Sequence, residues 1–110
     1  MKELDKGRCE GRAKIIKALA HPSRIFIIER LNERPYCVNE LTELIGADTS
    51  TVSKHLSLLK AAGIIEDRKE GTSVYYSLTC PCVLSLFECI EKVIEINLER
   101  QRFFFQSSNK

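Results

Sequence analysis

Two short amphipathic segments separated by a glycine constrain the fold of this 110-residue chain more than any other feature. Residues 37–45 and residues 49–62 each place apolar side chains at helical spacing, which predicts two helices. Gly46 follows the first pattern, where a helix commonly ends, and Asp48 or Thr49 is placed to cap the second. The pattern therefore predicts two short helices joined by a tight turn, which is the arrangement of a helix-turn-helix.

A β-hairpin is predicted directly after the second helix. Residues 64–69 form one candidate strand, and residues 73–79 form another in which apolar and polar side chains alternate. The sequence Glu70-Gly71-Thr72 between them suits a hairpin turn. A hairpin at this position is a wing, so we expect a mostly α-helical winged helix-turn-helix.

Three further helices are expected around this unit. Residues 7–20 have helical periodicity that ends at a His-Pro pair, because proline disfavours helix at the residue before it. The next helix follows over residues 22–34, and a long final helix runs from about residue 81 to residue 103. We expect one domain over residues 1–105 and a polar, disordered tail over residues 106–110.

The composition is that of an ordinary globular protein, with 44% hydrophobic and 29% charged residues. The net charge is only +2, so any affinity for nucleic acid must depend on where the charges lie. No apolar stretch approaches the roughly 18 residues that span a bilayer, and the charged N-terminus lacks the apolar run of a signal peptide. We therefore expect a cytoplasmic protein with no membrane partner, in a compartment that keeps thiols reduced.

The second helix of the predicted helix-turn-helix has a polar face suited to DNA. Its apolar positions Val52, Leu56 and Leu59 lie on one side. Short hydroxyls and cations elsewhere on the helix can approach phosphates and base edges without burying an unpaired carboxylate. Cations on the wing can reach backbone phosphate or an adjacent minor groove. The candidate DNA-binding residues are Ser50, Thr51, Ser53, Lys54 and His55 on the helix, with Arg68 and Lys69 on the wing.

Several motifs together resemble one known family. They are ALAHPSRI at residues 18–25, VNEL at 38–41, STVSKHLSLLKAAGII at 50–65 and YYSL at 75–78, together with the RKEG of the wing. Across about residues 13–98 the chain resembles the ArsR/SmtB family. The resemblance implies a homodimeric winged-helix transcriptional repressor that leaves its operator on binding metals or metalloids, or on thiol oxidation. It also implies that the five polar helix residues face the DNA groove.

The cysteines depart from the patterns of that family. Its arsenic, lead and cadmium sensors carry a Cys-Val-Cys pair before the recognition helix, whereas this chain has Cys37-Val38-Asn39. A three-sulfur arsenic site at that place is therefore incomplete. Zinc-type members place histidine and carboxylate ligands on the last helix, and the predicted last helix of this chain has no histidine.

Cys80-Pro81-Cys82 and Cys89 offer another set of thiols. Pro81 is suited to be the first residue of the final helix, which would put Cys82 in the first turn, where the helix dipole stabilises a thiolate. Cys89 lies on nearly the same face but about 10 Å further along, too far to share one ion within a straight helix. Either a partner helix brings Cys89 to Cys82 of the other subunit, or Cys37 meets the Cys80/Cys82 pair through folding.

The candidate sensing residues are therefore Cys37, Cys80, Cys82 and Cys89. No cofactor is obligatory, but an all-sulfur site would suit a thiophilic ion such as As(III), Cd(II), Pb(II), Cu(I) or Zn(II). A disulfide or persulfide switch among the same thiols is the alternative. Packing is the alternative role for Cys89, which lies on an apolar stripe, and Cys9 lies in a polar stretch and is interpreted as incidental.

The final helix is apolar over most of its circumference, so it requires burial on two sides. One side can pack on its own domain and the other on a twofold mate, which predicts a homodimer and a palindromic operator. The predicted dimer interface consists of Val83, Phe87, Ile90, Ile94 and Leu98.

Two other functions are weighed against a sensing repressor. One is a winged helix with no sensing role, in which every cysteine serves packing. The other is a thiol enzyme, but the chain has no Cys-x-x-Cys motif, no glycine-rich phosphate loop and no Ser/His/Asp set. We therefore expect a DNA-binding regulator and not an enzyme.

Overall fold

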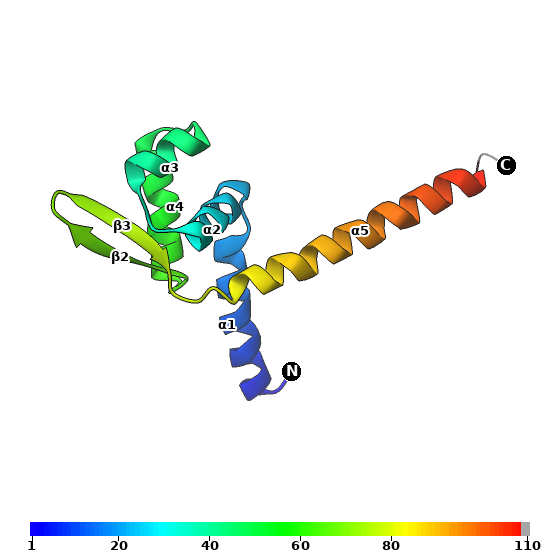
Figure 1. The fold of residues 1–110 in the computed structure, drawn as a ribbon. Helices are drawn as coiled ribbons and strands as arrows, with labels where there is room; N and C mark the ends of the chain where they lie inside the picture. Colours follow the sequence, from blue (N-terminus) through cyan, green and yellow to red (C-terminus); the bar gives the residue numbers. More distant parts are fainter. Residues whose placement is uncertain (109–110) are drawn as a thin grey trace.

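A computed structural model of the chain describes residues 1–108. The helices are α1 (Glu3–Leu19), α2 (Pro22–Glu33), α3 (Val38–Ile45), α4 (Thr49–Ala61) and α5 (Val83–Ser108). The strands are β1 (Tyr36–Cys37), β2 (Ile65–Glu70) and β3 (Ser73–Leu78). Figure 1 shows α2, α3, α4 and the β2–β3 hairpin gathered in one body, from which α5 projects as a long arm. The architecture is the predicted winged helix-turn-helix.

The helix-turn-helix consists of α3 and α4, and the turn between them depends on Gly46. This residue has φ +78°, a left-handed conformation in which a side chain would be strained, and its N–H donates to the carbonyl of Thr42. The core lies where α3 and α4 meet α2 and the sheet. Its fully buried side chains are Ile27, Ile28, Leu41, Val52, Leu56, Leu59 and Ile65.

The sheet is antiparallel with the order β1-β3-β2. Strand β3 pairs with β2 from Ile65↔Leu78 to Glu70↔Ser73, which leaves Gly71 and Thr72 as the hairpin loop. Strand β1 is an addition to the prediction, because two residues are too few to show an alternating pattern. It places Tyr36 opposite Tyr76 and so attaches the wing to the segment before α3.

The arm α5 differs from the prediction at both ends. It begins at Val83 instead of Pro81, because the segment before it turns through 3₁₀-type bonds such as Leu84 N–H to the carbonyl of Pro81. It continues to Ser108, so residues 106–108 are helical where a disordered tail was predicted. The rest of that predicted tail, residues 109–110, lies outside the described residues.

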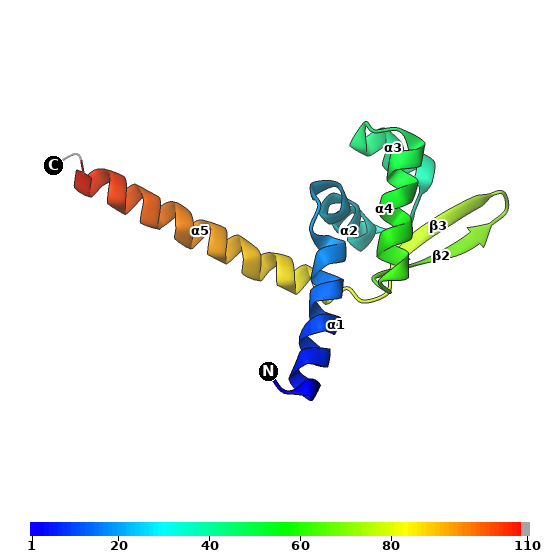
Figure 2. The ribbon, with the colours of Figure 1, turned by 180° about the vertical axis from the view of Figure 1, so that it is seen from behind.

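Only the first turns of α5 contact the chain's own core. Val83, Leu84 and Phe87 are half-buried against the core, so two of the five predicted interface residues, Val83 and Phe87, also pack within the chain. Beyond them the helix leaves the body, and the view from behind in Figure 2 shows the same separation. Ile90, Ile94 and Leu98 are 45–48% exposed. The arm is about 39 Å long at 1.5 Å per residue, so most of its apolar surface is uncovered in the single chain.

None of the helices in residues 1–108 combines the length and the hydropathy that a membrane crossing requires.

Candidate nucleic-acid interface

The start of α4 is fixed by its N-cap residue, Asp48. The Asp48 carboxylate accepts a hydrogen bond from the backbone N–H of Thr51 at 2.9 Å and another from the Ser50 hydroxyl at 3.3 Å. The bonds from Thr51 come first in lowering the pKa of Asp48, and the nearby Lys54 adds to the effect. These contacts hold the first turn of α4 in place and leave its outer face to solvent.

The polar face of α4 agrees in part with the prediction. Ser50, Thr51 and Lys54 are exposed, and Ser53 is half-buried. The side chains on the opposite face, including Val52 and Leu56, are fully buried. The exposed hydroxyls and the ammonium therefore lie together at the N-terminal half of α4, where another molecule can contact them.

His55 does not belong to this exposed face, which corrects the prediction for that residue. It is only 9% exposed. The spacing explains the error, since His55 follows Val52 by three positions and precedes Leu59 by four, which places it on the same face as both. A closer reading of the helical spacing would have assigned it to the buried side.

His55 instead joins α4 to the junction between α1 and α2. The Arg24 Nε–H donates to His55 Nδ1 at 3.1 Å, and Arg24 Nη1 donates to the carbonyl of Ala18 in α1 at 3.1 Å. The rings of His55 and His21 lie with centroids 4.4 Å apart. His21 also caps α2, since its Nδ1 accepts from the N–H of Ser23. One arginine and two histidines thus link three helices, a cluster that the sequence did not reveal.

The wing presents its two predicted cations on different faces. Arg68 and Lys69 are both exposed and adjacent in β2, so their side chains point to opposite sides of the hairpin. Arg68 pairs with Glu70 at 2.6 Å. Lys60 at the end of α4 pairs with Asp67 at 2.9 Å and so connects the helix to the wing, a contact that was not predicted.

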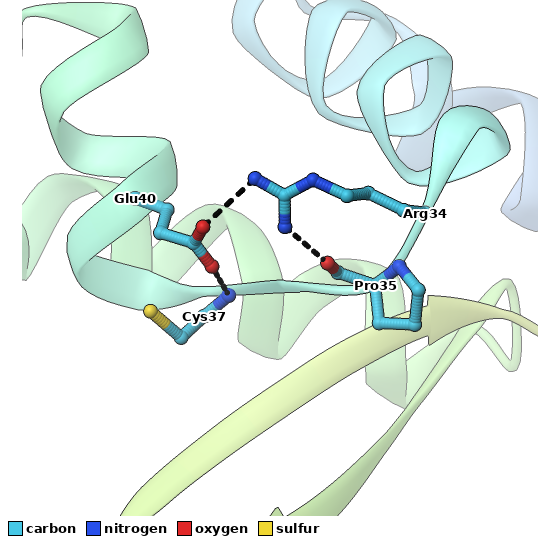
Figure 3. Close-up of polar contacts among 4 residues, drawn as sticks. All are labelled: Arg34, Pro35, Cys37 and Glu40. Atoms are coloured by element: carbon cyan, nitrogen blue, oxygen red, sulfur yellow. Dashed lines mark hydrogen bonds and ion pairs between the residues drawn. The ribbon is translucent and has the colours of Figure 1, made fainter.

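Figure 3 shows the polar contacts that fix the start of α3 around Cys37. Glu40 accepts from the backbone N–H of Cys37 at 3.0 Å and from Arg34 at 2.8 Å, and the guanidinium of Arg34 lies 3.7 Å from the ring centroid of Tyr36. The bond from Arg34 and then the bond from Cys37 lower the pKa of Glu40 to about 2. Cys37 itself is half-buried and has a free thiol.

The structure brings together two of the four predicted sensing cysteines. Cys80 and Cys82 form a disulfide, with Cα atoms 5.4 Å apart, in the exposed segment between β3 and α5. Cys82 precedes the first residue of α5, so it is not in the first turn as predicted. Cys89 is exposed and free. Within residues 1–108 of a single chain, no three cysteine, histidine or acidic residues are grouped as a metal site would need, so folding does not bring Cys37 into a site with the pair.

The fold and the exposed polar face of α4 define a winged helix-turn-helix transcriptional regulator that binds DNA, and not an enzyme. The family described as bacterial regulatory protein, arsR family, matches residues 21–67. An HTH-type transcriptional regulator of Mycobacterium tuberculosis is 37% identical over 84 residues, which are 76% of this chain and 74% of that protein. The chain belongs to the ArsR family of bacterial regulators.

Two further comparisons agree with this assignment. A homolog of the cadmium resistance transcriptional regulatory protein CadC from Staphylococcus aureus is 42% identical over 88 residues, 79% of this chain and 73% of that protein. The solution structure of a homodimeric winged helix-turn-helix DNA-binding domain from Mycobacterium bovis superposes with a TM-score of 0.75 at 29% identity. That match covers 91% of this chain and 93% of the other.

The link between His55 and Arg24 predicts that stability depends on pH. Burial, followed by the nearby charges of His21 and Arg24, lowers the pKa of His55 below its usual 6.5. The unfolded chain therefore takes up this proton first, and the stabilising contribution is complete above pH 6.5 and is lost as the pH falls through and below that value. We expect the urea midpoint to decrease between about pH 7.5 and about pH 5.5.

His55→Gln should remove most of this pH dependence, whatever its effect on absolute stability. His21→Asn, which retains a helix-capping side chain, serves as the matched control and should keep the dependence. An unchanged slope in His55→Gln would show that His55 is not the responsible group.

Proposed function

We propose that this chain is a homodimeric repressor that binds a palindromic operator in double-stranded DNA and whose affinity is controlled by Cys80 and Cys82. The observation that supports DNA binding is the exposed group of Ser50, Thr51 and Lys54 on a helix whose other face is buried in the core. A protein of this kind acts where chromosomal DNA lies, so we place it in the cytoplasm. A repressor then acts by occupying its operator.

The geometry of α4 supports its insertion into a major groove. The helix has 13 residues, so at 1.5 Å per residue it is about 20 Å long, and its exposed face carries hydroxyls and an ammonium without a carboxylate beyond the capping Asp48. A major groove admits an α-helix, and hydroxyl and ammonium groups can contact base edges and phosphates there. On the wing, Lys69 would contact the flanking backbone, and Arg68 would do so on exchanging its partner Glu70 for a phosphate.

The uncovered arm supports a dimer. Ile90, Ile94 and Leu98 repeat at helical spacing along α5 and project beyond the chain's own core. A twofold pairing of two arms would bury these side chains on both subunits at once. The same symmetry would present two copies of α4 to one duplex, which accounts for a palindromic operator with half-sites about one helical turn apart or a multiple of it.

The position of Cys80 and Cys82 supports their role as the control element. Four residues separate the end of β3 from the start of α5, and both cysteines lie among them. The Thr79 N–H bonds to the carbonyl of Ile64, which anchors the wing end of this link. A covalent change at the two sulfurs would alter the path between the wing and the arm, and hence the separation of the two α4 helices.

Two chemistries are open to this pair, and the disulfide between Cys80 and Cys82 supports the proposal of the first. In a disulfide switch, two thiols reduce an external disulfide oxidant to two thiols and become joined to each other, and each lost proton passes to the oxidant. In the second, the reduced pair binds a thiophilic ion such as As(III), Cd(II), Pb(II), Cu(I) or Zn(II). A third sulfur for such an ion would have to come from the second subunit, for which the exposed Cys89 is the candidate. Persulfide formation at the same pair is the remaining variant of the redox switch.

The DNA interface is tested with the triple variant Ser50→Ala, Thr51→Ala and Lys54→Ala. A duplex selected from a random library by the wild-type protein serves as the operator. We expect operator affinity to fall by about tenfold to a thousandfold, since each lost base contact costs about 1–3 kcal/mol. The slope of log affinity against log salt should decrease by about one for each phosphate contact that Lys54 makes. The matched control, Lys92→Ala on the arm, should bind normally, and equal binding by the triple variant would refute this interface.

The dimer is tested by placing charge on the arm. We expect Ile94→Glu with Leu98→Glu to give a folded monomer in sedimentation experiments, because two carboxylates per arm would be buried unpaired in the interface. Lys92→Glu is the control, since Lys92 lies about 160° around the helix from Ile94 and should leave the dimer intact. A dimer that persists in the double glutamate variant would exclude this face of α5.

The control element is tested with Cys80→Ser and Cys82→Ser together. We expect the wild-type protein to change its operator affinity by about tenfold or more after treatment with glutathione disulfide, and the variant to show no change. Cys9→Ser with Cys89→Ser is the matched control for disulfide switching. If the Cys80→Ser/Cys82→Ser variant still showed the full change in operator affinity, these two thiols would not control DNA binding.

Binding of a thiophilic ion is tested by titrating the reduced protein with As(III), Cd(II) and Zn(II) and following the sulfur charge-transfer absorbance. In this experiment we expect Cys89 to contribute to ion binding.

A further inference from the structure

A cleft between α1 and the C-terminal end of α4 lies apart from the groove-facing residues and from the thiols. It has a volume of about 300 Å³ and is lined by Lys14, Lys17, Ala18, Arg24, Leu58, Ala61 and Ala62. The α4 side of the cleft is entirely apolar, and Leu58 is 48% exposed there. A volume of this size is at the lower end of the range of about 300–1,000 Å³ that is usual for small-molecule sites.

The charges of the cleft all have one sign. Its three ionisable lining residues are Lys14, Lys17 and Arg24, and no carboxylate lines it. Among the described residues, Lys14 and Lys17 form no ion pair, whereas Lys60 and Arg68 are each neutralised by a carboxylate nearby. An apolar wall opposite unpaired cations is complementary to a molecule that has a carboxylate at one end and an apolar chain at the other.

Arg24 connects this cleft to the recognition helix. Two of its nitrogens are used, Nε toward His55 in α4 and Nη1 toward the carbonyl of Ala18 in α1. Its Nη2 has no partner within the described part of the chain. A carboxylate in the cleft can therefore bind the same guanidinium that holds α4 against α1, so its binding would change the contact between Arg24 and His55.

The proposed dimer leaves the cleft open. On α1, Lys14 lies about 160° around the helix from Ile16, whose apolar side chain is 55% exposed. The cations of the cleft and the uncovered apolar side of α1 thus face different directions. The arm α5 is also separate from the cleft, since it projects away from the body of the molecule (Figure 2).

We propose that this cleft binds a small amphipathic carboxylate, with the carboxylate at Lys14, Lys17 and Arg24 and the apolar chain against Leu58 and Ala62. The ligand would act as an effector by altering the Arg24 contacts with α4. This binding does not depend on the proposed control through the cysteines, and it is measurable without an operator.

Octanoate is the test probe. The control ligands are octan-1-ol, which lacks the carboxylate, and acetate, which lacks the long apolar chain. Calorimetry on the full chain should show saturable binding of octanoate and of neither control. We expect Lys14→Gln with Lys17→Gln to weaken octanoate binding about tenfold or more, and Leu58→Ser to weaken it as well. Lys2→Gln with Lys6→Gln removes the same charge at the N-terminal end of α1, outside the cleft, so this variant should bind octanoate like the wild type.

The two histidines of the chain give a second readout by proton NMR. Octanoate should shift the ring signal of His55, which is assigned by its persistence in His21→Asn. Absence of saturable binding, equal binding of octan-1-ol, or full binding by Lys14→Gln/Lys17→Gln would each overturn the proposal. If the wild-type protein shows no saturable octanoate binding and the lysine variant has a reduced duplex affinity, the two lysines contact DNA phosphates and the proposal is overturned.

Discussion

The packing of one face of α4 into the core is the constraint on which the rest of the molecule depends. Val52, Leu56 and Leu59 are fully buried, and Asp48 fixes where the helix begins. With its inner face fixed in this way, the helix cannot rotate, so its exposed hydroxyls and Lys54 keep one direction relative to the wing. A chain with a net charge of +2 has little bulk attraction for DNA, and it needs such a fixed arrangement of a few groups.

The polar contacts of α4 extend this fixation at both sides. Arg24 and His55 hold the helix to the α1–α2 junction, and Lys60 holds its end to Asp67 in the wing. The exposed Lys60–Asp67 pair adds little stability by itself, but it neutralises Asp67, the acidic residue that directly precedes the two wing cations. The recognition helix is thus connected to both elements that flank it.

The sequence predicts the elements of this fold well, because their signals are local. Helical spacing and the glycines after α3 and α4 are sufficient to place the helix-turn-helix, and the alternation around Gly71 places the wing. The errors have two sources, one local and one that depends on contacts distant in sequence. His55 was assigned by its polar chemistry although its spacing placed it inside, and Arg24 had no sequence signal because its partners lie 6 and 31 residues away. The two-residue β1 exists only through its pairing with β3.

The structure of the single chain also explains why the spacing of the cysteines along the sequence is not sufficient to identify the sensing site. Cys80 and Cys82 are close because a single residue, Pro81, lies between them, whereas any contact with Cys89 would depend on how two arms cross. The position of the pair is nevertheless informative, because the four-residue link is the covalent connection between the body that holds α4 and the arm proposed to hold the dimer. A twofold operator is sensitive to the distance between its two half-sites. A small change at this link would therefore be multiplied by the length of the arm, and chemistry on two sulfurs could control binding at a surface that they do not touch.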